Sequence, residues 1–348
     1  MASARFSFFR SIACLALAAV AWVTPARAQA YGDGFDPNGD ANIYAMIRQP
    51  DGRIIVGGNF TLFEPDHLGS PVSRERIARI NRDGTIDSTF TTYTNGDVSA
   101  IALQPDGRIV IAGKFSVVGS ASGEYARTGI ARLNADGSVD PTFVQVNPEG
   151  VGYYPQAIIR TVAVQADGKI LMGGAFSTLQ PEGSAAPVAR SRLARLNSNG
   201  TIDETFDVAV NNTVLALLVQ PDGDIVIGGG FSTVRAHGAT QAAERSRIAR
   251  LNADGTLDTG FAPALNNRVL ALARQADGKF VAAGEFTTIG MPNTSAVQAN
   301  FLARINADGT HDSTFSPSAS AAVESISIQA DGRIVITGRF TWIRSSGS

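Results

Sequence analysis

The residues of this chain best suited to chemistry are an arginine and an aspartate that recur together, eight positions apart. The arginines are Arg79, Arg132, Arg195, Arg250 and Arg304, and the aspartates are Asp87, Asp140, Asp203, Asp258 and Asp312. Clustered arginines with acids nearby could bind an anion or a sugar. Each arginine, however, has its own aspartate at a constant distance, and a residue pair of opposite charge stabilises two strands that face each other. We therefore expect a structural ion pair in every copy.

An Asn-x-Asp-Gly-x-x-Asp run lies inside each of these pairs and resembles a calcium-binding loop. A calcium loop of the EF-hand type needs an acid two residues before the Asn and a Glu six residues after the Gly. In the fourth copy these two positions hold Arg250 and Phe261. We expect a turn and no metal or cofactor, although the sequence leaves open a cation shared between neighbouring copies.

Other catalytic patterns are missing from the sequence. His67, His237 and His311 lie in unrelated contexts, and none has a second His or Cys at metal-ligand spacing. We expect all three in exposed loops. The chain also has no nucleophile elbow and no phosphate-binding glycine loop. These observations favour binding over catalysis.

The chemistry-bearing residues are carried by a repeated pair of hairpins. The first hairpin has the form Gln-Pro/Ala-Asp-Gly followed by an apolar run, and it begins at Gln49, Gln104, Gln165, Gln220, Gln275 and Gln329. The starts are 55, 61, 55, 55 and 54 residues apart, a period typical of one supersecondary unit copied along the chain. A type I turn ending in a left-handed glycine should join the two strands, here called A and B, and should place Leu103 opposite Ile109.

The second hairpin joins strand C, an Ile/Leu-Ala-Arg-Ile/Leu run, to strand D, which ends in Phe. In the fourth copy the turn predicts Leu251 opposite Leu257 and Arg250 opposite Asp258. Four short antiparallel strands repeated in this way predict an all-β fold, a β-propeller of four-stranded blades, about six in number with the last incomplete. An open solenoid and a sandwich array are alternatives. Strands A and B are apolar on both faces, which favours blades packed against each other.

Phenylalanine marks the expected core. Twelve of the fifteen Phe residues after residue 30 occupy two repeat positions, the end of strand B and the end of strand D. We interpret them as packing residues. They are Phe60, Phe115, Phe176, Phe231, Phe286 and Phe340 after strand B, and Phe35, Phe90, Phe143, Phe206, Phe261 and Phe315 after strand D.

The first thirty residues have the pattern of a secretory signal peptide. Arg5 and Arg10 precede an apolar run, and small residues suited to cleavage follow near Ala28 and Ala30. We therefore expect residues 1–30 to be removed, residues 31–348 to form one repeat domain, and the protein to be secreted or periplasmic. The remaining chain has no cysteine, and 26 basic against 31 acidic residues leave a net charge of about −5. This charge argues against nucleic acid as a partner, and no second long apolar stretch predicts a membrane span.

The paired motifs Q-P/A-D-G-[KR]-I-x-[VI]-x-G-x-F and [IL]-A-R-[IL]-N-x-D-G-x-x-D-x-x-F resemble the delta-60 repeat family. The resemblance covers residues 31–343. It implies a bacterial secreted or surface protein with a β-propeller domain of unknown function, and it implies no catalytic residues. In one copy Asn199 stands where the others have Asp, a change compatible with the turn.

The two ends of the chain depart from this pattern. There are six A–B hairpins but five C–D hairpins, and Gly32-Asp33-Gly34-Phe35 resembles the end of a D strand. Either the N-terminus completes the last blade by strand exchange and the ring closes imperfectly, or the sequence is a fragment. We favour the fragment.

Binding residues are expected where the copies differ. The A–B and C–D turns are uniform, whereas the B–C loops and D–A connections vary and should share the opposite face. The longest D–A connection, residues 144–157, carries Tyr153 and Tyr154, which are candidate ligand-binding residues. We expect an exported module that binds a protein or surface glycan. The alternative is a hydrolase or lyase with a site in the central channel.

Overall fold

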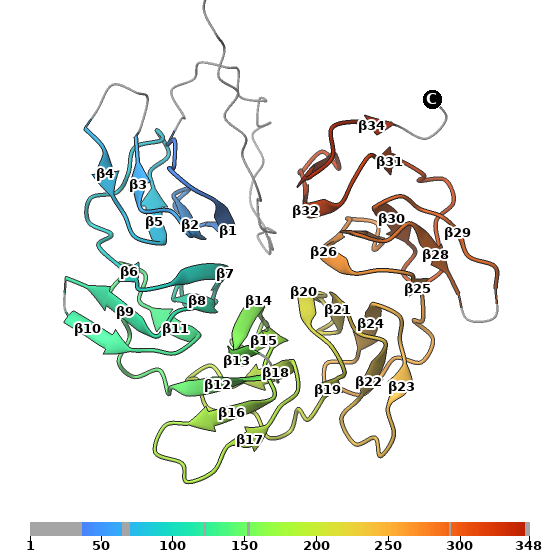
Figure 1. The fold of residues 1–348 in the computed structure, drawn as a ribbon, viewed down its shortest axis with the longest axis horizontal. Coiled ribbons are helices and arrows are strands. Elements are labelled where there is room, and N and C mark those ends of the chain that lie inside the picture. Colours follow the sequence, from blue (N-terminus) through green and yellow to red (C-terminus); the bar gives the residue numbers. More distant parts are fainter. Residues whose placement is uncertain (1–36, 65–69, 122, 152–153, 292–293, 345–348) are drawn as a thin grey trace, which may run out of the picture.

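The fold is built from six consecutive repeat units arranged around a common centre (Figure 1). The computed structural model describes residues 37–64, 70–121, 123–151, 154–291 and 294–344, without the side chains of 151 and 154–156. Every element among these residues is a β-strand. The expected signal peptide and Phe35 lie outside the described residues.

Strands A and B form the predicted antiparallel hairpin in all six units. The register pairs Leu103 with Ile109 and Ile101 with Ile111, as the turn predicted. At the turn, the Gly107 N–H donates to the Gln104 carbonyl, and Gly107 has a φ of 85°, so glycine is favoured there. The A strands are β1 (Ile43–Arg48), β7 (Asp97–Leu103), β14 (Ile158–Val164), β20 (Val214–Val219), β26 (Val269–Arg274) and β32 (Val323–Ile328). The B strands are β2 (Ile54–Gly58), β8 (Ile109–Lys114), β15 (Ile170–Ala175), β21 (Ile225–Gly229), β27 (Phe280–Gly284) and β33 (Ile334–Gly338).

Strand C pairs with the free edge of strand B and completes a three-stranded inner sheet in each of the first five units. The C strands are β5 (Ile77–Ile80), β11 (Ile130–Leu133), β18 (Leu193–Leu196), β24 (Ile248–Leu251) and β30 (Leu302–Ile305). In the sixth unit the described residues form a two-stranded inner sheet, β32–β33. Val335, Trp342 and Ile343 of this unit are 42%, 45% and 49% exposed.

The expected four-stranded blade is not confirmed, because the inner sheets have two or three strands among the described residues. Strand D is reduced to a single antiparallel bridge with strand C, as between Leu251 and Leu257. The reason is local: Asp87 Oδ1 accepts hydrogen bonds from the N–H and the hydroxyl of Thr89, and the Phe90 N–H donates to the Asp87 carbonyl. These bonds turn the chain away from strand C immediately after Asp87, so no ladder can extend.

A second set of small sheets lies at the periphery of the ring, outside the inner sheets (Figure 1). Three of them join two strands from the B–C segment to one strand from the preceding D–A connection: β6 (Tyr93–Thr94), β9 (Val117–Ser120) and β10 (Gly123–Ala126); β19 (Ala209–Val210), β22 (Thr233–Arg235) and β23 (Ala243–Glu244); and β25 (Ala264–Leu265), β28 (Thr288–Gly290) and β29 (Val297–Gln298). A fourth has two strands from the D–A connection, β12 (Val146–Val151) and β13 (Tyr154–Gln156), beside β16 (Thr178–Pro181) and β17 (Val188–Ala189). The first and last units carry the pairs β3 (Leu62–Phe63) with β4 (Val72–Ser73), and β31 (Ser318–Ala319) with β34 (Ile343–Arg344).

The core lies between consecutive units, where their A strands pack against one another around the centre. Phe residues after strands B and D fill it in the first five units up to Phe286, and Phe60, Phe90, Phe143 and Phe231 are at most 1% exposed. Phe315 and Phe340 of the same set are only partly buried. A glycine in strand B sets the packing distance. A Cβ on Gly57 would lie 3.0 Å from Ile101 Cδ1 of the next unit, and a Cβ on Gly58 would collide with the Asn42 carbonyl of its own unit.

Candidate binding surface

The recurring arginine and aspartate form an ion pair in every complete unit, buried in the first three units and partly exposed in the fourth and fifth. Arg132 Nε lies 2.8 Å from Asp140 Oδ2, and the side chains of both residues are at most 5% exposed. Arg132 also lies over the ring of Phe143, with its guanidinium carbon 4.9 Å from the ring centroid. The expected structural pair is therefore confirmed, and its equivalents are Arg79–Asp87, Arg195–Asp203, Arg250–Asp258 and Arg304–Asp312.

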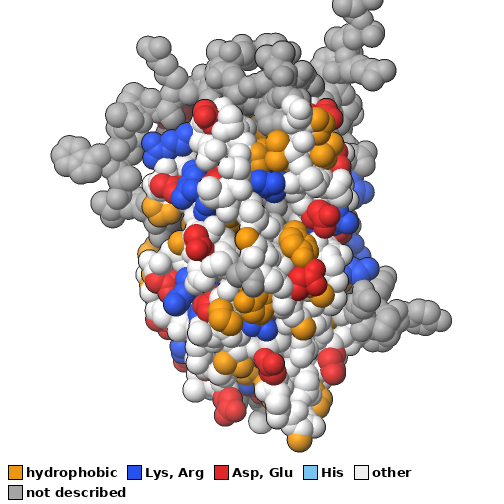
Figure 2. Space-filling model, turned by 90° about the vertical axis from the view of Figure 1, so that its left-hand side faces the viewer, with side chains coloured by type: hydrophobic (Ala, Val, Ile, Leu, Met, Phe, Trp, Pro, Cys, Tyr) orange, Lys and Arg blue, Asp and Glu red, His pale blue; other side chains and the backbone are white. Residues whose placement is uncertain are grey.

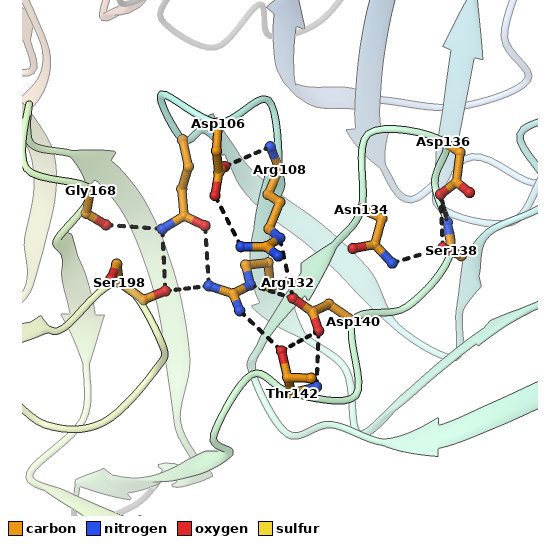
Figure 3. A network of polar contacts seen from close by, with 11 residues as sticks. Asp106, Arg108, Arg132, Asn134, Asp136, Ser138, Asp140, Thr142, Gly168 and Ser198 are labelled. Carbon is orange, nitrogen blue, oxygen red and sulfur yellow. Dashed lines mark hydrogen bonds and ion pairs between the residues drawn. The ribbon is translucent and has the colours of Figure 1, made fainter.

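The same arginine links each unit to the next. Figure 3 shows Arg132 between Asp140 of its own unit and Ser198 of the following one, where Arg132 Nη1 donates to the Ser198 carbonyl. The side-chain amide of Gln104 donates to the Gly168 carbonyl of that unit at 2.9 Å. The corresponding bonds run from Arg79 to Ala135, from Arg195 to Ala253 and from Arg250 to Ala307. These side chains are occupied by structural contacts and are not a clustered anion site.

The aspartates of these pairs are held in the charged state. Burial on its own would raise the pKa of Asp203, but hydrogen bonds from Thr205, Lys169 and Arg195 outweigh it and hold the pKa far below its ordinary value. Asp203 is therefore a fixed hydrogen-bond acceptor at neutral pH. A group of this kind holds two units together and does not exchange protons.

The Asn-x-Asp-Gly segments are turns, as predicted. Asp136 Oδ1 accepts hydrogen bonds from the N–H and the hydroxyl of Ser138, so the turn itself uses the carboxylate that calcium would need (Figure 3). Within the described part of the chain, no three His, Cys, Asp or Glu residues are grouped so that they could hold a metal ion.

The histidines only partly follow the expectation. His67 lies outside the described residues, and His237 is partly buried, with its Nδ1 accepting a bond from the Asp207 N–H. His311 is not in a loop, because it forms the single bridge to Ile305, and burial lowers the pKa of its imidazole. It occupies the strand position that holds an apolar residue in the other four units, for example Leu257.

The B–C segments are not irregular loops on one face. They continue strands B and C outward as hairpins of the peripheral sheets, for example β9–β10 and β22–β23. A buried apolar residue three positions after the B-strand Phe anchors each hairpin, and its exposure is 0% in the first five units. These residues are Phe63, Val118, Leu179, Val234 and Ile289. This Phe-x-x-apolar spacing is the sequence signal that reveals the outer sheets.

An asparagine side chain, here called the polar clamp, joins the D–A connection to the start of the B–C segment. Asn95 Oδ1 accepts bonds from the N–H groups of Ser116 and Val117, at 2.9 and 3.0 Å. Asn211 and Asn266 make the same two bonds in their units, always to residues 21 and 22 positions later. The sequence interpretation missed these asparagines, and the constant separation of 21 residues was the available signal.

The candidate residues Tyr153 and Tyr154 belong to the insertion that makes one repeat period 61 residues long. The insertion forms the hairpin β12–β13, in which Tyr154 pairs with Val151. Strand β13 lies at the edge of the only four-stranded sheet among the described residues, β13-β12-β16-β17. Tyr153 lies outside the described residues, and so does the side chain of Tyr154. The hairpin nevertheless distinguishes this unit from all others at the periphery.

A family model described as "Domain of unknown function (DUF5122) beta-propeller" matches residues 49–90, 104–143, 165–206, 220–261, 275–315 and 329–348. The chain belongs to this family. The matched segments begin at the six glutamines that open the A–B turns, so the resemblance to a repeat family of unknown function is confirmed.

Comparison with characterised proteins adds little to the DUF5122 assignment. No curated protein sequence matches the chain. Among solved structures, "Crystal structure of WD40 beta propeller domain of Doa1" is similar at 11% identity and a TM-score of 0.40, over 86% of this chain and 90% of that one. No helix among the described residues of the DUF5122 chain is long and apolar enough to cross a membrane.

The fourth DUF5122 repeat departs from the others at the recurring ion pair. A second cation supports the aspartate in neighbouring units, as Lys169 Nζ does for Asp203 at 3.0 Å and Lys279 Nζ for Asp312 at 2.6 Å. The fourth repeat has Asp224 at this position. Burial, followed by the nearby charge of Asp222, raises the pKa of Asp224. The fourth unit is therefore electrostatically the weakest of the complete ones.

We predict that Asp224→Lys stabilises the protein at pH 7 by about 0.5–1 kcal/mol, because it replaces a carboxylate near Asp258 by a cation. A raised pKa in the folded state means that ionisation of Asp224 costs stability as the pH rises. The gain should therefore shrink when the pH falls to about 4, because Asp224, whose pKa is raised, becomes protonated and no longer repels Asp258, whose pKa is lowered. Urea unfolding at both pH values measures the effect. Glu204→Lys, an exposed change of equal charge, serves as the control, and an equal gain in both variants would contradict the local explanation.

Proposed function

We propose that this chain is an exported binding module that recognises a protein or a surface glycan through its peripheral sheets. The β12–β13 hairpin carries the proposal, since it adds an edge strand to one peripheral sheet and breaks the repeat period there. An exposed edge strand can pair with a partner's main chain, and tyrosines add apolar area with a polar tip.

The uniform residues of the repeats support this assignment indirectly. The arginines and aspartates that could act on a ligand are engaged in ion pairs, which are buried in the first three units, and the turn acids are bonded to their own turns. Variation between units is concentrated at the periphery, where residues can change without loss of the core. Binding residues commonly lie on such variable segments of a rigid scaffold.

The charge pattern limits the kind of partner. Acidic and basic side chains are interspersed on the peripheral face shown in Figure 2, with apolar and uncharged side chains between them. A net charge of about −5 for residues 31–348 adds no attraction to a polyanion. A neutral glycan or a protein surface therefore fits better than nucleic acid. Export would follow from the signal-like residues 1–30.

The test uses residues 31–348, a glycan array of bacterial surface polysaccharides, and chemical cross-linking to cell-surface proteins. We expect the double change Tyr153→Ala and Tyr154→Ala to weaken the strongest interaction at least about tenfold, as loss of a tyrosine anchor does. Tyr125→Ala, on the neighbouring peripheral sheet, should leave that interaction unchanged. An unaltered affinity together with a lower melting temperature would show that the hairpin only packs against its own unit. Absence of any interaction would contradict a binding function.

A further inference from the structure

A shallow pocket of about 210 Å³, open to solvent, lies at the periphery between the first and second units. Its lining comes from two segments, one at the end of β4 and one at the start of β6, and consists of Ser73, Arg74, Glu75, Thr91, Thr92 and Tyr93. Four of these six side chains carry a hydroxyl group. This region lies on the side where β4, β6, β9 and β10 meet in Figure 1.

The repeats provide an internal comparison for this pocket. At the equivalent positions between the other units, the arginine that corresponds to Arg74 is kept in most cases. The residues that correspond to the hydroxyl-bearing side chains change. The position of Tyr93 holds Val146, Ala209, Ala264 and Ser318, and the position of Thr92 holds Gln145, Val208, Pro263 and Pro317. The position of Thr91 holds Val144, Asp207, Ala262 and Ser316. The fold therefore does not require this set of hydroxyls, and a function specific to the first junction explains them better than packing does.

The ring of Tyr93 is held in place before any ligand arrives. Tyr93 pairs with Gly119 of β9, and a Cβ on Gly119 would collide with the tyrosine ring, so the ring rests on the glycine. The Tyr93 hydroxyl donates to Glu124 Oε1 of β10. A half-buried aromatic ring fixed at both ends offers an apolar face at little cost in conformational entropy.

The remaining hydrogen-bonding capacity suits a neutral polyol. The Thr91 hydroxyl accepts from the Ala121 N–H and can still donate. The Thr92 hydroxyl donates to the Gly137 carbonyl, and Thr92 is 1% exposed, so this hydroxyl belongs to the fold. Arg74 donates to the carbonyls of Ser73 and Asp87, so its guanidinium is engaged with the main chain. With Glu75 in the lining and Glu124 beside Tyr93, an anionic ligand would meet two carboxylates.

We propose that this pocket binds a single neutral sugar ring, with Tyr93 against its apolar face and the exposed hydroxyl of Thr91 on one of its hydroxyl groups. The volume is below the about 300–1,000 Å³ of pockets that enclose drug-sized ligands, so one ring fits and an oligosaccharide would extend outward. The inference rests on the proposed function, because it assigns a glycan as the partner of the peripheral surface and gives one subsite for it.

The experiment is saturation-transfer NMR on residues 31–348 with a panel of free glucose, galactose, mannose and N-acetylglucosamine. We expect one of these sugars to receive saturation, and Tyr93→Ala to weaken its binding at least about tenfold. The variant should fold, since alanine stands at this position in two other units, as Ala209 and Ala264. Tyr125→Ala, which removes a tyrosine from the same small sheet outside the pocket, is the matched control and should bind as the unaltered chain does.

Two results would overturn the inference. Saturation of none of the four sugars would exclude a neutral monosaccharide subsite, and equal binding by the Tyr93→Ala and Tyr125→Ala variants would place the sugar elsewhere. Neither result would touch the proposed function if the Tyr153 and Tyr154 double variant still lost its partner. Failure of both tests would remove the subsite and the binding function together.

Discussion

Arg195→Ala is expected to lower the free energy of unfolding by about 3–5 kcal/mol, the usual cost of removing one partner of a buried ion pair. Arg195 Nε lies 2.7 Å from Asp203 Oδ2, and Nη1 donates to the Ala253 carbonyl of the next unit at 2.6 Å. Its guanidinium also lies over the ring of Phe206, with the guanidinium carbon 4.4 Å from the ring centroid. The substitution therefore leaves a buried carboxylate and removes a bond between two units. Urea unfolding at pH 7 measures the loss.

The pH dependence of this loss identifies its cause. Because the folded pKa of Asp203 is lowered, the pair contributes stability above the ordinary pKa of an aspartate, about 3.9, and loses it as the pH falls. The deficit of Arg195→Ala should thus shrink below about pH 4. Arg333→Ala is the control, since Arg333 is 80% exposed in its pair with Asp331, and it should change stability by at most about 0.5 kcal/mol. Equal losses in the two variants would refute the role of the buried pair.

Phe231→Ala is expected to cost about 3–5 kcal/mol, as typically follows from emptying a buried phenylalanine site. Phe231 is 0% exposed at the end of β21 and packs in one cluster with Phe206 and Val234. The cavity left by the substitution would lie where the inner sheet, the peripheral sheet and the preceding D segment meet. Denaturant unfolding measures the loss, which should appear without a change in fold by circular dichroism.

Trp342→Ala is the matched control for Phe231→Ala. Trp342 is also aromatic and lies two residues after the equivalent Phe340, but it is 45% exposed. Its removal should therefore cost far less. If the two variants unfolded at the same denaturant concentration, the assignment of the repeated phenylalanines to the core would be wrong.

The inner sheets were predictable because their register is set by local turn chemistry. The Gln-Pro/Ala-Asp-Gly turn fixes which residues of strands A and B face each other, and Leu103 opposite Ile109 follows directly from it. The same holds for Leu251 opposite Leu257 across the second turn. In both cases the deciding residues lie within a few positions of each other, so sequence alone contains the answer.

The peripheral sheets and the reduced strand D were not predicted. The peripheral strands are very short, and the contacts that place them join residues far apart in the sequence. Strands such as β6 and β19 have two residues each, too few for a periodicity to show. Strand D ends early because Asp87 caps Thr89, a contact that the pattern of apolar residues does not reveal. Asn95 must find Ser116, 21 positions away, before the polar clamp exists.

The two candidate sites also differ in how far the sequence alone could reveal them. The sequence indicated Tyr153 and Tyr154 as candidates because they lie in an insertion that interrupts the repeat period. In the structure this insertion forms the β12–β13 hairpin. The pocket between the first two units has no motif, since Glu75 and Thr91 meet only after β4 and β6 are placed by different peripheral sheets. Comparison of equivalent positions between units could have suggested Tyr93, whose equivalents are small or aliphatic.

We expect ligands to bind at the peripheral sheets and not on the uniform turns. Hydrogen–deuterium exchange of residues 31–348, with and without the tightest ligand from the glycan array, tests this expectation most directly. We predict slower exchange in β12 and β13 or around β4 and β6, with unchanged exchange in the A–B and C–D turns. Protection confined to those turns, for example at Gly107 and Gly137, would contradict this expectation.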